Sequence, residues 1–141
     1  ALDGLPEGIV RIDVFAAETA VAARTVLGTN KEYIPLRVNT LVGTGVSRVI
    51  SKYAGTLSLI DTIIEGSLAV ADATLTAKIN GVAVTTGVVT IAQAGSAAGD
   101  KDSATPTGAN TVAVGDELSL TCGGGNTTAT VANAWFESTR T

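Results

Sequence analysis

Short β-forming runs, separated by turn residues at intervals of about 8–12 positions, constrain the fold of this 141-residue chain most. The runs are rich in Val, Ile, Thr and Leu, and Gly, Asn or Asp stands between them. β-Branched side chains fit a pleated sheet, whereas Gly and Asn tolerate the backbone angles of tight turns. Strands and helices do not alternate along the chain, which argues against a parallel α/β fold. We therefore predict an all-β protein, a single jelly-roll-like antiparallel β-sandwich with an N-terminal arm.

The strands are expected at residues 9–15, 33–42, 46–53, 56–64, 73–79, 82–92 with a break at Gly87, 111–114, 117–122 and 128–136. Asn80-Gly81 is the strongest hairpin signal, because both turn residues of such a hairpin need positive φ. Ala54-Gly55 predicts a second hairpin, and Pro35 places its strand at a sheet edge or at a strand entrance. In the run 56–64, Leu57, Leu59 and the following odd positions are expected to share one face.

Two Gly-rich segments are predicted to lie outside the strands. Residues 93–110 form a long loop of small and polar residues, and a loop of this length is usually functional or mobile. Residues 123–127 are predicted to be a flexible hairpin tip.

The chain divides into residues 1–30, an arm with the first strand, and residues 31–141, the β-sandwich domain. Gly4, Pro6 and Gly8 interrupt any regular structure at the start. The Ala-rich segment 16–27 is compatible either with a short helix or with an extended arm. No basic and apolar leader begins the chain, and no run approaches about 18 apolar residues, so neither export nor a membrane span is expected.

The residue inventory argues against catalysis, cofactors and metals. There is no histidine, which removes the commonest general base and metal ligand. Cys122 is the single cysteine and is expected to be a buried, inert thiol. Asp100 and Asp102 lack a calcium-loop pattern, and Asp116 reads as a turn cap. We expect no catalytic residue, no cofactor-binding residue and no metal site, and hence no enzyme.

The surface is expected to meet other proteins. Only 16% of the residues are charged, so much of the surface must be neutral. The nine basic residues are scattered and the net charge is −4, which disfavours nucleic acid as a partner. Trp135 and Phe136 are adjacent in a predicted strand, so one should be buried while the other is free to meet a partner.

From Gly55 to Phe136 the chain resembles small phage structural proteins encoded near capsid genes. The matching pieces are Gly55-Thr56-Leu57, Ala71-Asp72-Ala73-Thr74-Leu75-Thr76, Ile79-Asn80-Gly81-Val82-Ala83-Val84, Gly95-Ser96-Ala97-Ala98-Gly99-Asp100, Ser103-Ala104-Thr105-Pro106-Thr107 and Val114-Gly115-Asp116-Glu117-Leu118. More loosely, the Asn-Gly hairpin and the strand after Asp116 resemble trimeric jelly rolls of the tumour-necrosis-factor and C1q type. The resemblance implies a capsid decoration (cement) protein. Such a protein would be made in the host cytoplasm, would lie on the capsid exterior of the virion and would form a homotrimer that binds the major capsid protein.

The candidate capsid or partner contacts are apolar and basic residues of the arm together with the C-terminal tryptophan, namely Leu2, Leu5, Pro6, Ile9, Val10, Arg11, Phe15, Arg24 and Trp135. Three other functions remain open. A tail or fibre module would bind a host receptor or glycan through residues 93–110 and 123–127. An adhesion sandwich and an enzyme are the others, and the missing leader and the residue inventory argue against them.

Overall fold

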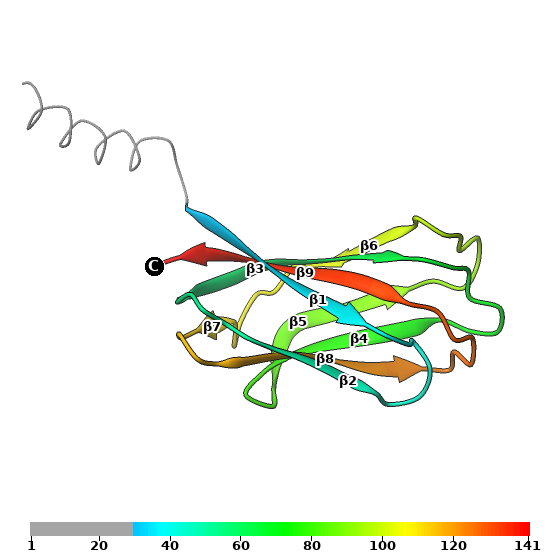
Figure 1. The fold of residues 1–141 in the computed structure, drawn as a ribbon, viewed down its shortest axis with the longest axis horizontal. Helices are drawn as coiled ribbons and strands as arrows, with labels where there is room; N and C mark the ends of the chain where they lie inside the picture. The colour runs from blue at the N-terminus through cyan, green and yellow to red at the C-terminus, as the bar shows by residue number, and fades with distance from the viewer. Residues whose placement is uncertain (1–29) are drawn as a thin grey trace, which may run out of the picture. The chain divides into compact units, whose positions relative to one another are not determined.

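The computed structural model describes residues 30–141, in which every regular element is a β-strand. The strands are β1 (Lys31–Val38), β2 (Val46–Ile50), β3 (Gly55–Ile64), β4 (Ala73–Ile79), β5 (Val82–Ile91), β6 (Lys101–Ala104), β7 (Thr111–Val112), β8 (Glu117–Gly124) and β9 (Ala132–Arg140). They form two antiparallel sheets, β1-β9-β3-β6 with β7 beside β3, and β2-β8-β4-β5 (Figure 1). No helix in the described part of the chain is long and apolar enough to cross a membrane.

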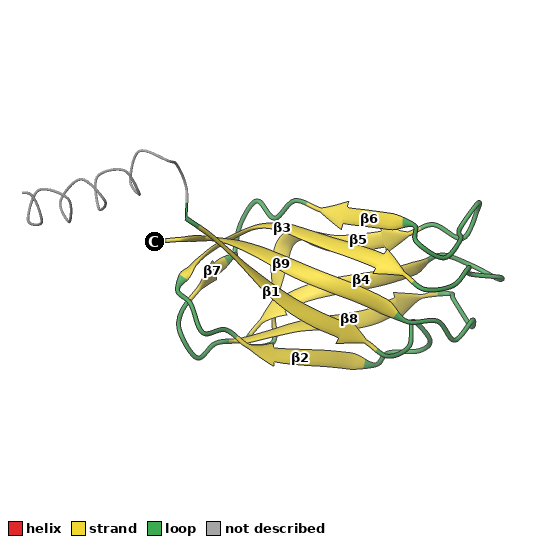
Figure 2. Ribbon diagram, turned by 45° about the horizontal axis from the view of Figure 1, so that its top comes forward, coloured by secondary structure: helices red, strands yellow, loops and turns green. Residues whose placement is uncertain are grey.

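The strand order is that of a jelly roll, in which early strands pair with late ones around a central hairpin. That hairpin is β4-β5, and outside it β3 pairs with β6, β2 with β8 and β1 with β9. These pairs follow one another as a single long two-stranded ribbon. When the ribbon is rolled up, β3 also pairs with β9 and β4 with β8, and the strands are divided between two stacked layers (Figure 2). The prediction of an all-β jelly-roll sandwich is confirmed; the predicted arm and strand in residues 1–29 lie outside the described residues.

The core lies between the two sheets and consists mostly of branched aliphatic side chains around one aromatic ring. Phe136 on β9 is fully buried, and removing one such side chain from water contributes about 2–3 kcal/mol. Leu75 on β4 and Leu118 and Leu120 on β8 complete the opposite wall. Cys122 is also buried in this layer, as predicted, and its Sγ donates to the carbonyl oxygen of Thr40 at 3.3 Å.

Two predictions about local structure are confirmed. Asn80 and Gly81 both have positive φ, 49° and 84°, and connect β4 directly to β5. Pro35 lies in β1, which is an edge strand of its sheet. An edge tolerates proline because the missing N–H is not needed by a second neighbour.

The hairpin predicted at Ala54-Gly55 is wrong, because β2 and β3 belong to different sheets. The chain crosses between the layers there through a turn in which the Ser51 hydroxyl contacts the backbone nitrogen and oxygen of Tyr53. Gly55 then passes so close to Thr139 that a Cβ would lie 2.4 Å from the Thr139 carbonyl oxygen. The glycine therefore allows β3 to approach β9 instead of forming a hairpin turn.

The face predicted for β3 is correct only at its beginning. Leu57 is buried, but a bulge between Leu57 and Leu59 changes the alternation, so Ile60, Thr62 and Ile64 point inward instead of the odd positions. Because an extra residue reverses every later side chain, one bulge overturns a strictly alternating prediction.

Both segments predicted to be irregular have defined roles. The 93–110 loop contains β6, which pairs with β3 although only Ala104 of its four residues is buried. The 123–127 segment is not a flexible hairpin tip, since β8 includes Gly123 and Gly124 and the following residues cross to the other sheet. The buried side chain of Asn126 fixes this crossing by donating to the carbonyl oxygens of Leu41 and Thr128.

Candidate functional site

The outer face of the β1-β9-β3-β6 sheet carries two of the exposed aromatic side chains of residues 30–141, Tyr33 and Trp135. Because side chains alternate along a strand, Phe136 enters the core while Trp135 faces outward and is 39% exposed. The prediction that one of the two is buried and the other exposed is confirmed. In the sheet register Pro35 lies opposite Trp135 on one side, and Asp61 lies opposite it on the other. Tyr33, two residues before Pro35 on β1, is 59% exposed.

A hollow of about 360 Å³ lies beside the tryptophan. It is lined by Asp61, Thr62, Ile63, Lys101 and Trp135, from β3, β6 and β9. Asp61 and Lys101 bring one negative and one positive group to its border, and neither joins an ion pair within residues 30–141. The hollow therefore combines an aromatic ring, an aliphatic side chain and two charged groups that can donate or accept hydrogen bonds.

Charged side chains surround this apolar area and hold its edges in place. Lys31 Nζ lies 2.9 Å from Glu137 Oε1, and Arg37 lies 3.6 Å from the Glu65 carboxylate. The Asn133 amide also donates to Glu65, at 2.6 Å. An apolar centre with a polar rim is the usual composition of a protein contact area.

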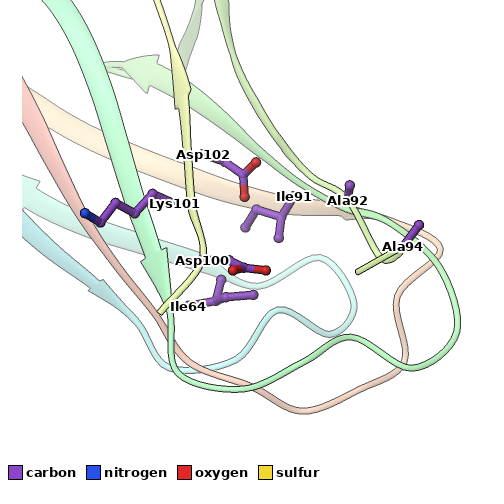
Figure 3. Close-up of a pocket in the computed structure, with 7 residues that line it drawn as sticks. All are labelled: Ile64, Ile91, Ala92, Ala94, Asp100, Lys101 and Asp102. Carbon is purple, nitrogen blue, oxygen red and sulfur yellow. The ribbon is translucent and has the colours of Figure 1, made fainter. Parts of the chain in front are cut away.

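A second pocket, of about 230 Å³, opens between β6 and the end of β5, and its lining is Ile64, Ile91, Ala92, Ala94, Asp100, Lys101 and Asp102 (Figure 3). The two aspartates lie on the pocket side of β6, whereas the Lys101 amine points away from them. Partial burial, and then repulsion from Asp100, raise the pKa of Asp102 above its ordinary value. Asp100 Oδ2 accepts a hydrogen bond from the Ala97 N–H at 2.7 Å, so this carboxylate closes a turn.

Within residues 30–141 no three His, Cys, Asp or Glu side chains cluster as metal ligands would. The Asp100–Asp102 pair therefore has no third acidic, His or Cys side chain beside it among these residues. Asp116 acts as the predicted turn cap, because its Oδ2 accepts from the Ala113 N–H at 2.8 Å.

Of the nine predicted contact residues, Trp135 is in the described structure and the eight between Leu2 and Arg24 lie outside it. Sequence reasoning missed Tyr33, Pro35, Asp61 and Lys101 as neighbours of the tryptophan. Pro35 was a usable signal, because it indicates that its strand lies at a sheet edge and pairs with only one neighbouring strand. Asp61 and Lys101 carried no such signal, because their positions depend on the bulge in β3 and on the undetected strand β6.

No family model matches the chain, and a search of the curated proteins finds no match. Among solved structures, the CsCBM6-3 module from Clostridium stercorarium in complex with cellobiose is 13% identical, with a TM-score of 0.48 over 81% of this chain and 85% of that chain. The carbohydrate-binding module CBM36 in complex with calcium and xylotriose is 18% identical, with a TM-score of 0.43 over 79% of this chain and 88% of that chain. The tripod from the baseplate of bacteriophage Tuc2009 is 6% identical, with a TM-score of 0.28 over 79% of this chain and 47% of that chain.

Proposed function

We propose that this chain is a capsid decoration protein, which binds the outer surface of a phage shell and stabilises it without catalysis. The observation that carries the proposal is the outward-facing Trp135, set beside Pro35 on a sheet whose other face contributes Phe136 to the core. A partner meets this apolar surface already in place, so little conformational entropy is lost on binding. The resemblance of residues 55–136 to phage structural proteins supports the capsid as the partner.

The arm residues from Leu2 to Arg24 belong to the same proposal as a second contact with the shell. A segment that becomes ordered on its target can cover a large surface, and several copies on a symmetric lattice add avidity. The proposed partners are thus the major capsid protein and further copies of the chain, with three-fold association implied by the resemblance. The proposed location is the exterior of the virion.

Co-sedimentation with phage heads that lack the protein tests this function. The wild-type chain should sediment with the heads, and Trp135→Ala should weaken binding by about tenfold or more, because a Trp that becomes buried in an interface is a frequent hot spot. Tyr53→Ala is the matched control, since Tyr53 is 38% exposed and lies in the connection between β2 and β3, not on β9. A wild-type chain that remains in the supernatant would reject the proposal.

A second function, glycan or receptor binding by a tail or fibre module, is supported by the hollow beside Trp135. Its volume falls within the range of small-molecule sites, and it places Asp61 and Lys101 next to an aromatic ring. Binding of the labelled protein to host cells, abolished by Trp135→Ala and accompanied by no binding to heads, would favour this function over decoration.

A further inference from the structure

The two sheets have four edges, formed by β1, by β6 together with β7, by β5 and by β2, and three of these edges carry features that block pairing with another chain. β1 contains Pro35, and β6 has only four residues, of which Lys101 and Asp102 are charged. The edge of β5 is occupied at its centre, where Thr85 exchanges backbone hydrogen bonds of 2.9 and 3.0 Å with Gly108 and Thr107. Proline, charge, short length and covering segments are the usual protections of a sheet edge.

β2 is one residue longer than β6, and neither a proline nor a covering segment of residues 30–141 blocks its open side. Its sequence, Val-Ser-Arg-Val-Ile, has no proline, no glycine and one charge, and β-branched residues make up most of it. It pairs with β8 on one side, and it forms the lower rim of the sandwich in both ribbon views (Figures 1 and 2).

The hydrogen bonds at both ends of β2 show which of its backbone groups face the open side. Cys122 N–H donates to the Gly45 carbonyl at 2.8 Å, and Ser51 N–H donates to the Asp116 carbonyl at 2.9 Å. Hydrogen-bonded pairs alternate in an antiparallel ladder, so the odd residues of β2 bond to β8 and the even residues point away. The N–H and C=O groups of Val46, Arg48 and Ile50 therefore face the open edge, and no other segment of residues 30–141 bonds to them.

The side chains of the same three residues lie on the outer face of the sheet. Val46 and Ile50 are 37% and 46% exposed, and they flank Arg48. Arg48 Nε lies 3.2 Å from the Glu117 carboxylate, and the Arg48 side chain is 58% exposed, so much of the guanidinium group is open to solvent. A strand pairing with β2 would thus meet two apolar side chains and a cation able to bind a carboxylate.

Self-pairing is the poorer use of this edge. The symmetric antiparallel register that employs all three outward-facing residues places Arg48 opposite Arg48 of a second copy, and like charges directly opposite destabilise a ladder. Shifting the register by two residues places Arg48 opposite Ile50 but carries Val46 past the end of the partner strand. A strand of a different sequence avoids this conflict.

We propose that β2 docks one extended strand of the capsid protein, with a carboxylate opposite Arg48 and apolar residues next to it. The inference rests on the proposed function for the identity of the partner. The strand extends the β2-β8-β4-β5 sheet, so backbone hydrogen bonds supply affinity and Arg48 selects an acidic sequence. The contact is separate from the Trp135 face, which belongs to the other sheet.

Hydrogen exchange resolved to single amides, with and without phage heads lacking the protein, tests the inference. In the free protein the amides of Val46, Arg48 and Ile50 should exchange rapidly, while those of Ser47 and Val49, bonded to β8, are protected. On the heads the three outward amides should slow by about tenfold or more, as expected for newly formed ladder bonds. Wild-type protein that binds the heads without protecting these amides would overturn the inference and leave decoration standing.

Arg48→Pro supplies the matching variant, because this N–H does not bond to β8 and proline is tolerated at such an edge position. Affinity for heads should fall by about tenfold, as expected for the loss of one ladder bond together with the charge. Arg48→Gln should lose only the charge contribution. Val88→Thr on β5 is the control and should bind normally, because Val88 is as exposed as Ile50 of β2, 46%, but lies on a different edge. If Arg48→Pro fails to fold, the hydrogen-exchange experiment on the wild-type protein still shows whether β2 pairs with a strand on the heads.

Three further outcomes would also reject the proposed docking of a strand on β2. Amide protection in free protein that grows with concentration would show that a second copy occupies β2. Protection that is present and independent of concentration would show that the chain covers the edge itself. Failure of the wild-type protein to bind heads would reject the proposed function and this inference together.

Discussion

The Ser58 hydroxyl donates a 2.7 Å hydrogen bond to Oε1 of Glu137, the same oxygen that Lys31 Nζ approaches at 2.9 Å. The bond from Ser58, and then that from Lys31, hold the pKa of Glu137 below its ordinary value. Ser58 is the residue added by the β3 bulge, so the bulge provides the hydroxyl group. One carboxylate thereby joins β1, β9 and β3 at the edge of the apolar face.

Replacing this hydroxyl should destabilise the protein in a pH-dependent way. Ser58→Ala should lower the free energy of unfolding at pH 7 by about 1 kcal/mol, as expected for a partly exposed charge-assisted bond. Because the folded pKa of Glu137 is depressed, its stabilisation is present above its ordinary pKa of 4.5 and is lost as pH falls through the folded value. Urea unfolding at pH 7 and pH 3 checks this, with Ser103→Ala on β6 as control. An equal loss at both pH values would contradict it.

Substitutions at two adjacent residues of β9 should differ widely in their effect on the stability of the fold. Phe136→Ala removes a fully buried ring and should cost about 3–5 kcal/mol, from lost burial and the cavity left behind. Trp135→Ala should change the free energy of unfolding far less, because this side chain is 39% exposed. Thermal and urea unfolding of both variants measure the difference. A Trp135→Ala variant as unstable as Phe136→Ala would show that the tryptophan is a core residue.

The sequence predicted best where one residue determines local geometry. The Asn80-Gly81 turn, the edge position of Pro35 and the opposite orientations of Trp135 and Phe136 follow from backbone angles and strand alternation alone. The Ala54-Gly55 error arose because a glycine that allows close strand approach resembles a glycine in a turn. The site itself depended on register, and a bulge at Ser58 together with a strand as polar as β6 leaves no periodic signal in the sequence.

The Asn126 side chain should be a structural requirement of the crossing between β8 and β9. Its amide donates to Leu41 and Thr128, and its Oδ1 accepts from the Thr128 N–H at 2.9 Å. Asn126→Ala leaves the buried Leu41 carbonyl and the partly buried Thr128 carbonyl without this donor and should cost about 2 kcal/mol. Urea unfolding tests this, with the more exposed Asn133→Ala as the comparison. Equal, small effects for both variants would restore the flexible-tip interpretation.

Asp116 should make the protein sensitive to acid. The Ala113 N–H, and then the Asn80 amide, lower the pKa of this carboxyl group below its ordinary value of 3.8. The resulting stabilisation is present above pH 3.8 and is lost as pH falls through the folded pKa. Asp116→Ala should therefore unfold at less urea than wild type at pH 7, and the two should converge near pH 2. A gap that persists in acid would show that the charge is not involved.

The Cys122 thiol should be inert in the folded protein. Burial raises its pKa above the ordinary value, and thiolate, the reactive form, is thereby reduced further. Ellman's reagent at pH 8 should react slowly with native protein and rapidly after unfolding in urea. Rapid reaction without denaturant would contradict the burial of this side chain.

The pairing of early strands with late ones also sets when the protein can fold. Glu32 and Arg140 are 108 positions apart yet their side chains meet at 3.1 Å, so the closing contacts of the sheet span almost the whole domain. Folds dominated by such distant pairings reach the native state in about milliseconds to seconds. During synthesis, at about 5–20 residues per second, β1 cannot form its pairing with β9 until β9 has left the ribosome. A chain interrupted before Ala132 would hold the local β4-β5 hairpin but lack the strand that pairs with both β1 and β3, and such a product is a natural substrate for chaperones and proteases.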